Sequence, residues 1–134
     1  MNIRSSLLLF SPLLLPISVL ADTVVYTDAG HPPANITPDT QVVFLDGPTQ
    51  LLAQWFGELP DDPQQAAGRA TALMQSPQWA QRQQQLAASW RGVIRAHALG
   101  VGQYPAVVFD DREVVYGTAD VAKANALRAR GGVR

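Results

Sequence analysis

The stretch that decides the fold is YPAVVFDDREVVYG, residues 104–117. Its two apolar runs, Ala106–Phe109 and Val114–Tyr116, are rich in valine and aromatic residues, which is typical of β-strands. Residues 110–112 between them leave room only for a short turn, so the two strands are expected to pair antiparallel. Pro105 opens this predicted hairpin at the entry to a strand, where the missing backbone N–H is tolerated.

Helices are predicted on both sides of the hairpin. Downstream, Thr118 is the expected N-cap of a helix from about Ala119 to Arg128. Upstream, two or three helices are expected, with segments over residues 50–57, 63–75 and 77 to about 99. The expected boundary residues of these three segments are Thr49 as a cap, Asp62 as a cap before Pro63, and Gly100 as a stop.

The longest predicted helix carries one apolar stripe. Its members recur at helical spacing: Trp79, Leu86, Trp90, Val93, Ile94 and His97. Trp90 is expected in the core and His97 in the core or at its boundary, whereas Trp55 and Trp79 are candidates for either core or a surface patch. Gly92 costs the helix up to about 1 kcal/mol relative to alanine and would allow close packing on a sheet.

Two further strands are predicted near the N-terminus, at residues 23–27 and 41–45. Both are continuous apolar runs, a pattern of strands covered on both faces. The long crossovers suit parallel pairing, while the hairpin adds an antiparallel pair. The sequence therefore predicts an α/β fold with a four-stranded mixed sheet and helices on both faces.

Length and composition set the domain organisation. In this chain of 134 residues, residues 1–21 have the features of a signal peptide: a basic start, an apolar run broken by prolines, and small residues Val19 and Ala21 before the cleavage site. An uncleaved anchor is the alternative, but a spanning helix needs about 20 unbroken apolar residues. We expect an exported protein with one domain over residues 22–134 and no membrane span in the mature chain.

Charge and cysteine content exclude several function classes. Removal of Arg4 with the signal peptide leaves 9 basic and 11 acidic side chains, which argues against direct nucleic-acid binding. The chain has no cysteine, so it can form no disulfide and perform no thiol redox chemistry.

The hairpin and its surroundings resemble a known family. The motif GVxxYPAVVFD at residues 100–110, followed by VVYG at 114–117, together with residues 23–28 and 42–46, is similar to periplasmic proteins encoded by integrating conjugative elements. The resemblance covers roughly Thr23 to Ala126 and extends to thioredoxin-like pilus-assembly proteins of conjugative plasmids. It implies a periplasmic location, a thioredoxin-like fold without a CxxC motif, a cis peptide bond before Pro105, and a role in conjugation through type IV secretion.

The resemblance also suggests where the protein binds its partners. Thioredoxin-like enzymes carry their cysteines just after the first strand, and here that place is occupied by Ala29-Gly30-His31-Pro32. A binding surface is therefore expected at Asp28, Gly30, His31, Pro32, Tyr104 and Pro105, together with the edges of the small sheet. The expected partners are other proteins of a conjugative transfer apparatus, with no catalytic residue, no metal and no cofactor.

Two other functions remain open at the level of sequence. Asp28, Asp46 and His31 follow neighbouring strands and could form a metal-dependent hydrolase site, although turn-capping carboxylates beside a solvated histidine are the simpler interpretation. A chaperone could hold unfolded clients in a groove by Pro105. The acidic hairpin tip, Asp110 to Glu113, is interpreted as solvated turn residues rather than an acid–base pair.

Overall fold

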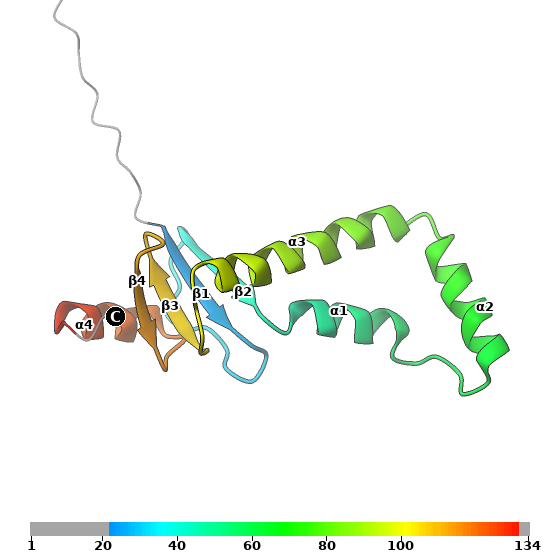
Figure 1. The fold of residues 1–134 in the computed structure, drawn as a ribbon, viewed down its shortest axis with the longest axis horizontal. Coiled ribbons are helices and arrows are strands. Elements are labelled where there is room, and N and C mark those ends of the chain that lie inside the picture. Colours follow the sequence, from blue (N-terminus) through cyan, green and yellow to red (C-terminus); the bar gives the residue numbers. More distant parts are fainter. Residues whose placement is uncertain (1–21, 132–134) are drawn as a thin grey trace, which may run out of the picture.

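The computed structural model describes residues 22–131, and the predicted signal peptide at residues 1–21 lies outside them. The described chain forms four strands and four helices (Figure 1). In chain order they are β1 (Thr23–Thr27), β2 (Thr40–Phe44), α1 (Gly47–Phe56), α2 (Pro63–Met74), α3 (Trp79–Ala98), β3 (Ala106–Phe109), β4 (Glu113–Tyr116) and α4 (Val121–Ala129).

The strands form one mixed sheet in the order β2-β1-β3-β4. β1 and β2 run parallel, whereas β3 is antiparallel to both β1 and β4. β1 and β3 are therefore central, and β2 and β4 are the edges. The protein is a mixed α/β protein with a four-stranded mixed sheet, as the sequence predicts, and three helices separate β2 from β3.

The β3–β4 hairpin closes through two residues with left-handed backbone geometry. Asp110 and Asp111 have φ values of 53° and 54°, and the Arg112 N–H donates a hydrogen bond to the Phe109 oxygen (3.1 Å). Aspartate tolerates this conformation better than most residues with a side chain. The acidic pair thus gives the short turn that the sequence predicts.

One face of the sheet packs against α4. Val25 and Val107, from the two central strands, are fully buried there with Val121 and Ala124 of α4. Because successive strand residues point to opposite faces, the intervening side chains build a second cluster on the other face.

The other face packs against the C-terminal half of α3. Tyr26 and Val108 are buried there with Ala96 of α3. Gly92, one helical turn earlier, lies directly over Val43 of β2. The predicted arrangement of helices on both faces is therefore confirmed, as is the close approach at Gly92.

β2 departs from the expectation that both early strands are covered on both faces. β1 is buried from Val24 to Thr27, but the β2 residues are only half-buried or exposed, and the Phe44 side chain is 42% exposed. The reason is topological: β2 has a neighbouring strand on one side only, and α4 lies toward β4 at the opposite edge (Figure 1).

Two predicted helix boundaries are confirmed. The Asp62 side chain caps α2 by accepting a hydrogen bond from a first-turn N–H. Gly100, at φ 72°, ends α3: its N–H donates to the His97 oxygen, and the Val101 N–H donates to the Ala96 oxygen. This pair of bonds is the Schellman pattern that a glycine after a helix allows.

Two predicted caps are wrong. α1 begins before Thr49, directly after Asp46, because a proline in the first turn has a backbone already suited to a helix. α4 is capped by Asp120, whose side chain accepts two first-turn N–H groups, while Thr118 accepts the N–H of Asp120 itself. α3 also begins slightly later than predicted, at Trp79.

α1, α2 and the N-terminal half of α3 project beyond the β2 edge of the sheet, and we call them the helical arm (Figure 1). Its inner surface contains Trp55, Phe56 and Trp79, with ring centroids 6.2 Å apart in edge-on contacts with Trp79. Pro48 is the one buried residue in α1, and α2 has none. The helical arm is thus held by a thin apolar layer, not a closed core.

Candidate functional site

The loop after β1 carries the histidine and carboxylate predicted to bind partners. His31 Nδ1 lies 2.6 Å from Asp28 Oδ1, and the His31 backbone oxygen accepts a hydrogen bond from Thr27 Oγ1. The side-chain hydrogen bond with His31 is the main cause that lowers the pKa of Asp28. The His31 side chain is 54% exposed, and Gly30 and Pro32 beside it are exposed as well. These residues therefore form a surface loop.

The second predicted part of the site is the segment before β3. The Tyr104–Pro105 peptide bond is cis, as the resemblance implies. Tyr26 pairs with Ala106, so the loop after β1 and the segment before β3 leave the same end of the sheet on adjacent strands. Tyr104 is exposed there. The predicted residues are thus brought to one end of the sheet.

Asp46, at the end of β2, takes part in a different set of contacts. Its Oδ2 accepts hydrogen bonds from the Ala29 N–H (3.2 Å) and from Gln50 Nε2 (3.3 Å). Its Oδ1 is buried and has no hydrogen-bond partner among the described residues. Within residues 22–131, no three histidine, aspartate or glutamate side chains converge in a way that could hold a metal ion.

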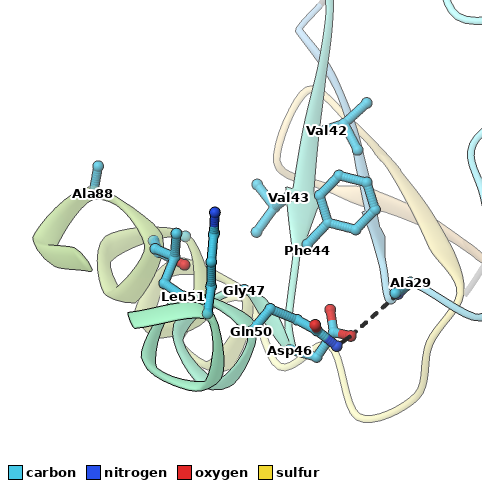
Figure 2. A pocket seen from close by; sticks show the side chains of 12 residues that line it. Ala29, Val42, Val43, Phe44, Asp46, Gly47, Gln50, Leu51 and Ala88 are labelled. Atoms are coloured by element: carbon cyan, nitrogen blue, oxygen red, sulfur yellow. Dashed lines mark hydrogen bonds between the residues drawn. The ribbon is translucent and has the colours of Figure 1, made fainter. Parts of the chain in front are cut away.

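A groove of about 530 Å³ lies between β2, α1 and α3. Figure 2 shows Val42 and Phe44 on one side of the β2 ribbon and Val43 on the other, with α1 below them. The groove therefore runs along the edge of the sheet and does not lie on either face alone. Neither Tyr104 nor Pro105 lines it.

The groove lining is mostly apolar with a few polar groups. Strand β2 gives the valine and phenylalanine side chains, α3 gives small residues, and α1 gives leucine and two glutamines. Asp46 is the charged residue of this lining. The full set is Ala29, Val42, Val43, Phe44, Asp46, Gly47, Gln50, Leu51, Gln54, Ala88, Ser89 and Gly92.

The backbone of β2 is open toward this groove. The Leu45 N–H donates to the Thr27 oxygen on β1 (2.8 Å). Because backbone groups alternate in direction along a strand, Val43 also faces β1, whereas the N–H and C=O groups of Val42 and Phe44 point away from the sheet. β2 has no second neighbouring strand within the described chain, so these four groups lie at the open edge of the sheet, and both residues line the groove.

The apolar stripe of α3 does not pack where the sequence predicts. α3 faces the sheet with its small residues, and Trp90 and Ile94, one turn apart, are 48% and 62% exposed. The prediction that Trp90 lies in the core is therefore wrong, and His97 is exposed as well. The physical reason is that Gly92 and Ala96 allow a closer approach to the sheet than bulky side chains would.

The acidic hairpin tip is engaged in structural contacts. Asp111 forms an ion pair with Arg95 of α3, and Asp110 Oδ1 accepts the Asp22 N–H (3.0 Å). Arg128 of α4 pairs with Glu113 (3.0 Å) and lies over the Phe109 ring. These contacts fit the interpretation of the tip as turn residues.

None of the described helices is long and apolar enough to cross a membrane.

A comparison with protein families assigns this chain to one of them. The chain belongs to the family described as "Protein of unknown function (DUF1525)", whose model matches residues 20–130. No curated protein and no solved structure matches it. The family description assigns no activity, so a function must be argued from the geometry.

Sequence reasoning missed the groove for an identifiable reason. Its members come from β2, α1 and α3, and which helices stand beside which edge depends on how the chain crosses between strands. One signal was available: Gly47 and Gly92 are glycines at which a Cβ would strike Ser89 Oγ at 2.5 Å and Val43 Cγ1 at 2.7 Å. Glycines that permit such close approach mark where the helices meet each other and the edge strand.

Proposed function

We propose that this protein is an exported, redox-inactive binding protein with a thioredoxin-like fold that helps to assemble or stabilise a conjugative DNA-transfer apparatus through protein–protein contacts. The observation that carries this proposal is the groove beside β2, which combines an apolar lining with an open strand edge. Apolar concave surfaces with a few polar groups are the usual form of binding sites.

The proposed role in conjugation rests on the family resemblance, and the observed architecture supports the proposed fold in part. The motif at residues 100–117 is similar to that of periplasmic proteins of integrating conjugative elements. The four-stranded mixed sheet with helices on both faces is compatible with a thioredoxin-like architecture. The lack of cysteine removes thiol chemistry from that architecture and leaves its surface as the means of action.

Site-specific photo-crosslinking in mating cells tests the proposal. A photoreactive residue at Gln54, in the groove, should capture a component of the transfer apparatus. The matched control is the same residue at Lys123, exposed on α4 at the far face of the sheet, which should not capture it. Equal capture from both positions, or none from Gln54, would contradict binding at the groove.

A hydrolytic role is the second candidate, because the His31–Asp28 pair at 2.6 Å is a possible base with its orienting carboxylate. The arrangement lacks the third partner that the hypothesis needs, since Asp46 binds Ala29 and Gln50. DNA transfer and the Gln54 crosslink are measured together in a His31→Ala strain. A loss of transfer with protein level and crosslink retained would favour hydrolysis, whereas a binding role predicts that transfer and crosslink are kept or lost together.

A chaperone role is the third candidate, because the groove presents apolar side chains to extended chains. The aggregation of unfolded client proteins, measured with and without this protein, distinguishes a chaperone from an assembly factor. We expect no protection of arbitrary clients. Broad protection would favour the chaperone.

A further inference from the structure

We propose that the groove binds an extended segment of a partner protein, which adds to the sheet as a new strand beside β2. This inference rests on the proposed function, because it names the kind of partner segment that the groove takes. Three features of the molecule support it: the open backbone of β2, the lining of the groove, and the position of Asp46.

The backbone of β2 offers donors and acceptors that only another strand satisfies in full. Val42 and Phe44 each present one N–H and one C=O away from β1, and both residues line the groove. Water can solvate these groups, but an extended peptide pairs with them in register and excludes water from the apolar side chains beside them. Exposed edges of this kind are the usual templates for strand addition.

The lining sets the side chains that such a segment would carry. A strand beside β2 would direct alternate side chains toward the two faces of the sheet. On one face they would meet Val43 and the α1 and α3 residues Leu51 and Ala88, and on the other Val42 and Phe44. Both sets are apolar, so the segment is apolar at most positions that enter the groove.

Asp46 adds a charge requirement. It is the acidic residue of the lining, and its Oδ1 is buried with no hydrogen-bond partner within residues 22–131. A buried carboxylate oxygen without a donor is costly, and a cationic side chain or an N–H group in the groove would supply one once the Asp46 side chain turns toward it. The segment should therefore carry a lysine or arginine level with Asp46, at the end of the groove where β2 ends.

The helical arm favours a single strand over a second copy of this protein. α1 and α3 line the groove together with β2, and the arm continues beyond the β2 edge (Figure 1). A strand needs only about 4.8 Å beside β2. The edge of a second sheet would bring its own helices against the arm, whereas one extended segment passes between the arm and the strand.

The test uses the purified protein and a blocked hexapeptide that has four valines, one threonine and one lysine. Amide hydrogen exchange is measured with and without the peptide. We expect exchange at Val42 and Phe44 to slow by more than about tenfold, while exchange at Val43, already bonded to β1, is unchanged. A peptide methylated on its central backbone nitrogens should bind at least about tenfold more weakly. Binding without protection at Val42 and Phe44, or equal binding of the methylated peptide, would overturn the proposal.

The charge requirement is tested by a double-mutant cycle. Asp46→Asn keeps an oxygen that can accept from Ala29, and a peptide with norleucine in place of lysine keeps the aliphatic stem. Each change alone should weaken binding by about tenfold, and the two together should cost little more than one. Fully additive losses would show that lysine and Asp46 do not meet.

Other occupants of the edge give different results. Protection of Val42 and Phe44 without peptide that grows with protein concentration would assign the edge to a second copy. Protection at every concentration without peptide would assign it to a segment of this chain. Either result overturns this inference and leaves the crosslinking test of the proposed function standing. If the methylated peptide reduced the crosslink between Gln54 and a partner protein, the proposed binding function would be supported and strand addition would be rejected.

Discussion

Gly92 on α3 and Val43 on β2 approach so closely that a Cβ on the glycine would lie 2.7 Å from Val43 Cγ1. Real Cβ atoms do not tolerate such a distance, so the contact fixes how near α3 comes to the edge strand. The contact therefore also sets the distance between β2 and the α3 residues that line the groove, Ala88, Ser89 and Gly92.

Gly92→Ala should destabilise the protein. Overpacking costs about 1–3 kcal/mol, and the gain in helix propensity returns up to about 1 kcal/mol, so we expect a net loss of about 1 kcal/mol. Gly68→Ala in α2 is the matched control, because a Cβ there meets nothing within 4 Å and only the propensity gain remains. Chemical denaturation measures both. A change of the same sign in the two variants would contradict the packing argument.

Asp120 should contribute a pH-dependent part of the stability. The hydrogen bond from Asn35 is the largest cause that lowers its pKa, followed by the N–H groups of α4 that it caps. Because the folded pKa lies below the ordinary 3.8, this contribution is complete above that value and is lost as the pH falls through the folded pKa.

Three variants separate the capping and charge effects of Asp120. Asp120→Ala should lower the melting temperature at neutral pH, since the cap is lost. Asp120→Asn should retain most of the stability, because asparagine also caps, yet show a weaker dependence on acid below pH 4. Asn35→Ala should weaken that acid dependence as well. Thermal melts between pH 2 and 7 measure this, and identical acid profiles for wild type and Asp120→Asn would contradict the assignment.

The hairpin turn should depend on backbone geometry more than on charge. Asp111 has a φ of 54° and pairs with Arg95 at an exposed site. Exposed ion pairs contribute about 0–1 kcal/mol, so Asp111→Asn should cost little, because asparagine also adopts this conformation. Asp111→Val should cost about 1–3 kcal/mol, since a β-branched residue is strained there. Equal losses for the two variants would assign the effect to the ion pair.

The exposed part of the α3 stripe should contribute little to folding. Trp90→Gln is expected to change the free energy of unfolding by no more than about 0.5 kcal/mol, since the ring is 48% exposed. Phe109→Ala, at a buried position, should cost about 3–5 kcal/mol. Urea denaturation compares them, and a large loss for the tryptophan variant would show that it packs as the sequence suggests.

The strands, the hairpin and two of the helix limits could be predicted because they depend on local chemistry. Runs of valine, the proline after Asp62 and the glycine at position 100 each act within a few residues. The face that α3 presents to the sheet could not be predicted, because hydrophobicity favours Trp90 while close packing favours Gly92. The groove was missed for the same reason, since it is made by contacts between segments distant in sequence.

The sparse burial of the helical arm has a mechanical consequence. Since Pro48 is the one buried residue of α1 and none is buried in α2, few apolar contacts resist separation of these helices from the sheet. Segments of this kind open locally at a lower free energy than central strands such as β1 and β3. The helical side of the groove can therefore move while the β2 side stays fixed, and the width of the groove adjusts to the size of the segment that enters it.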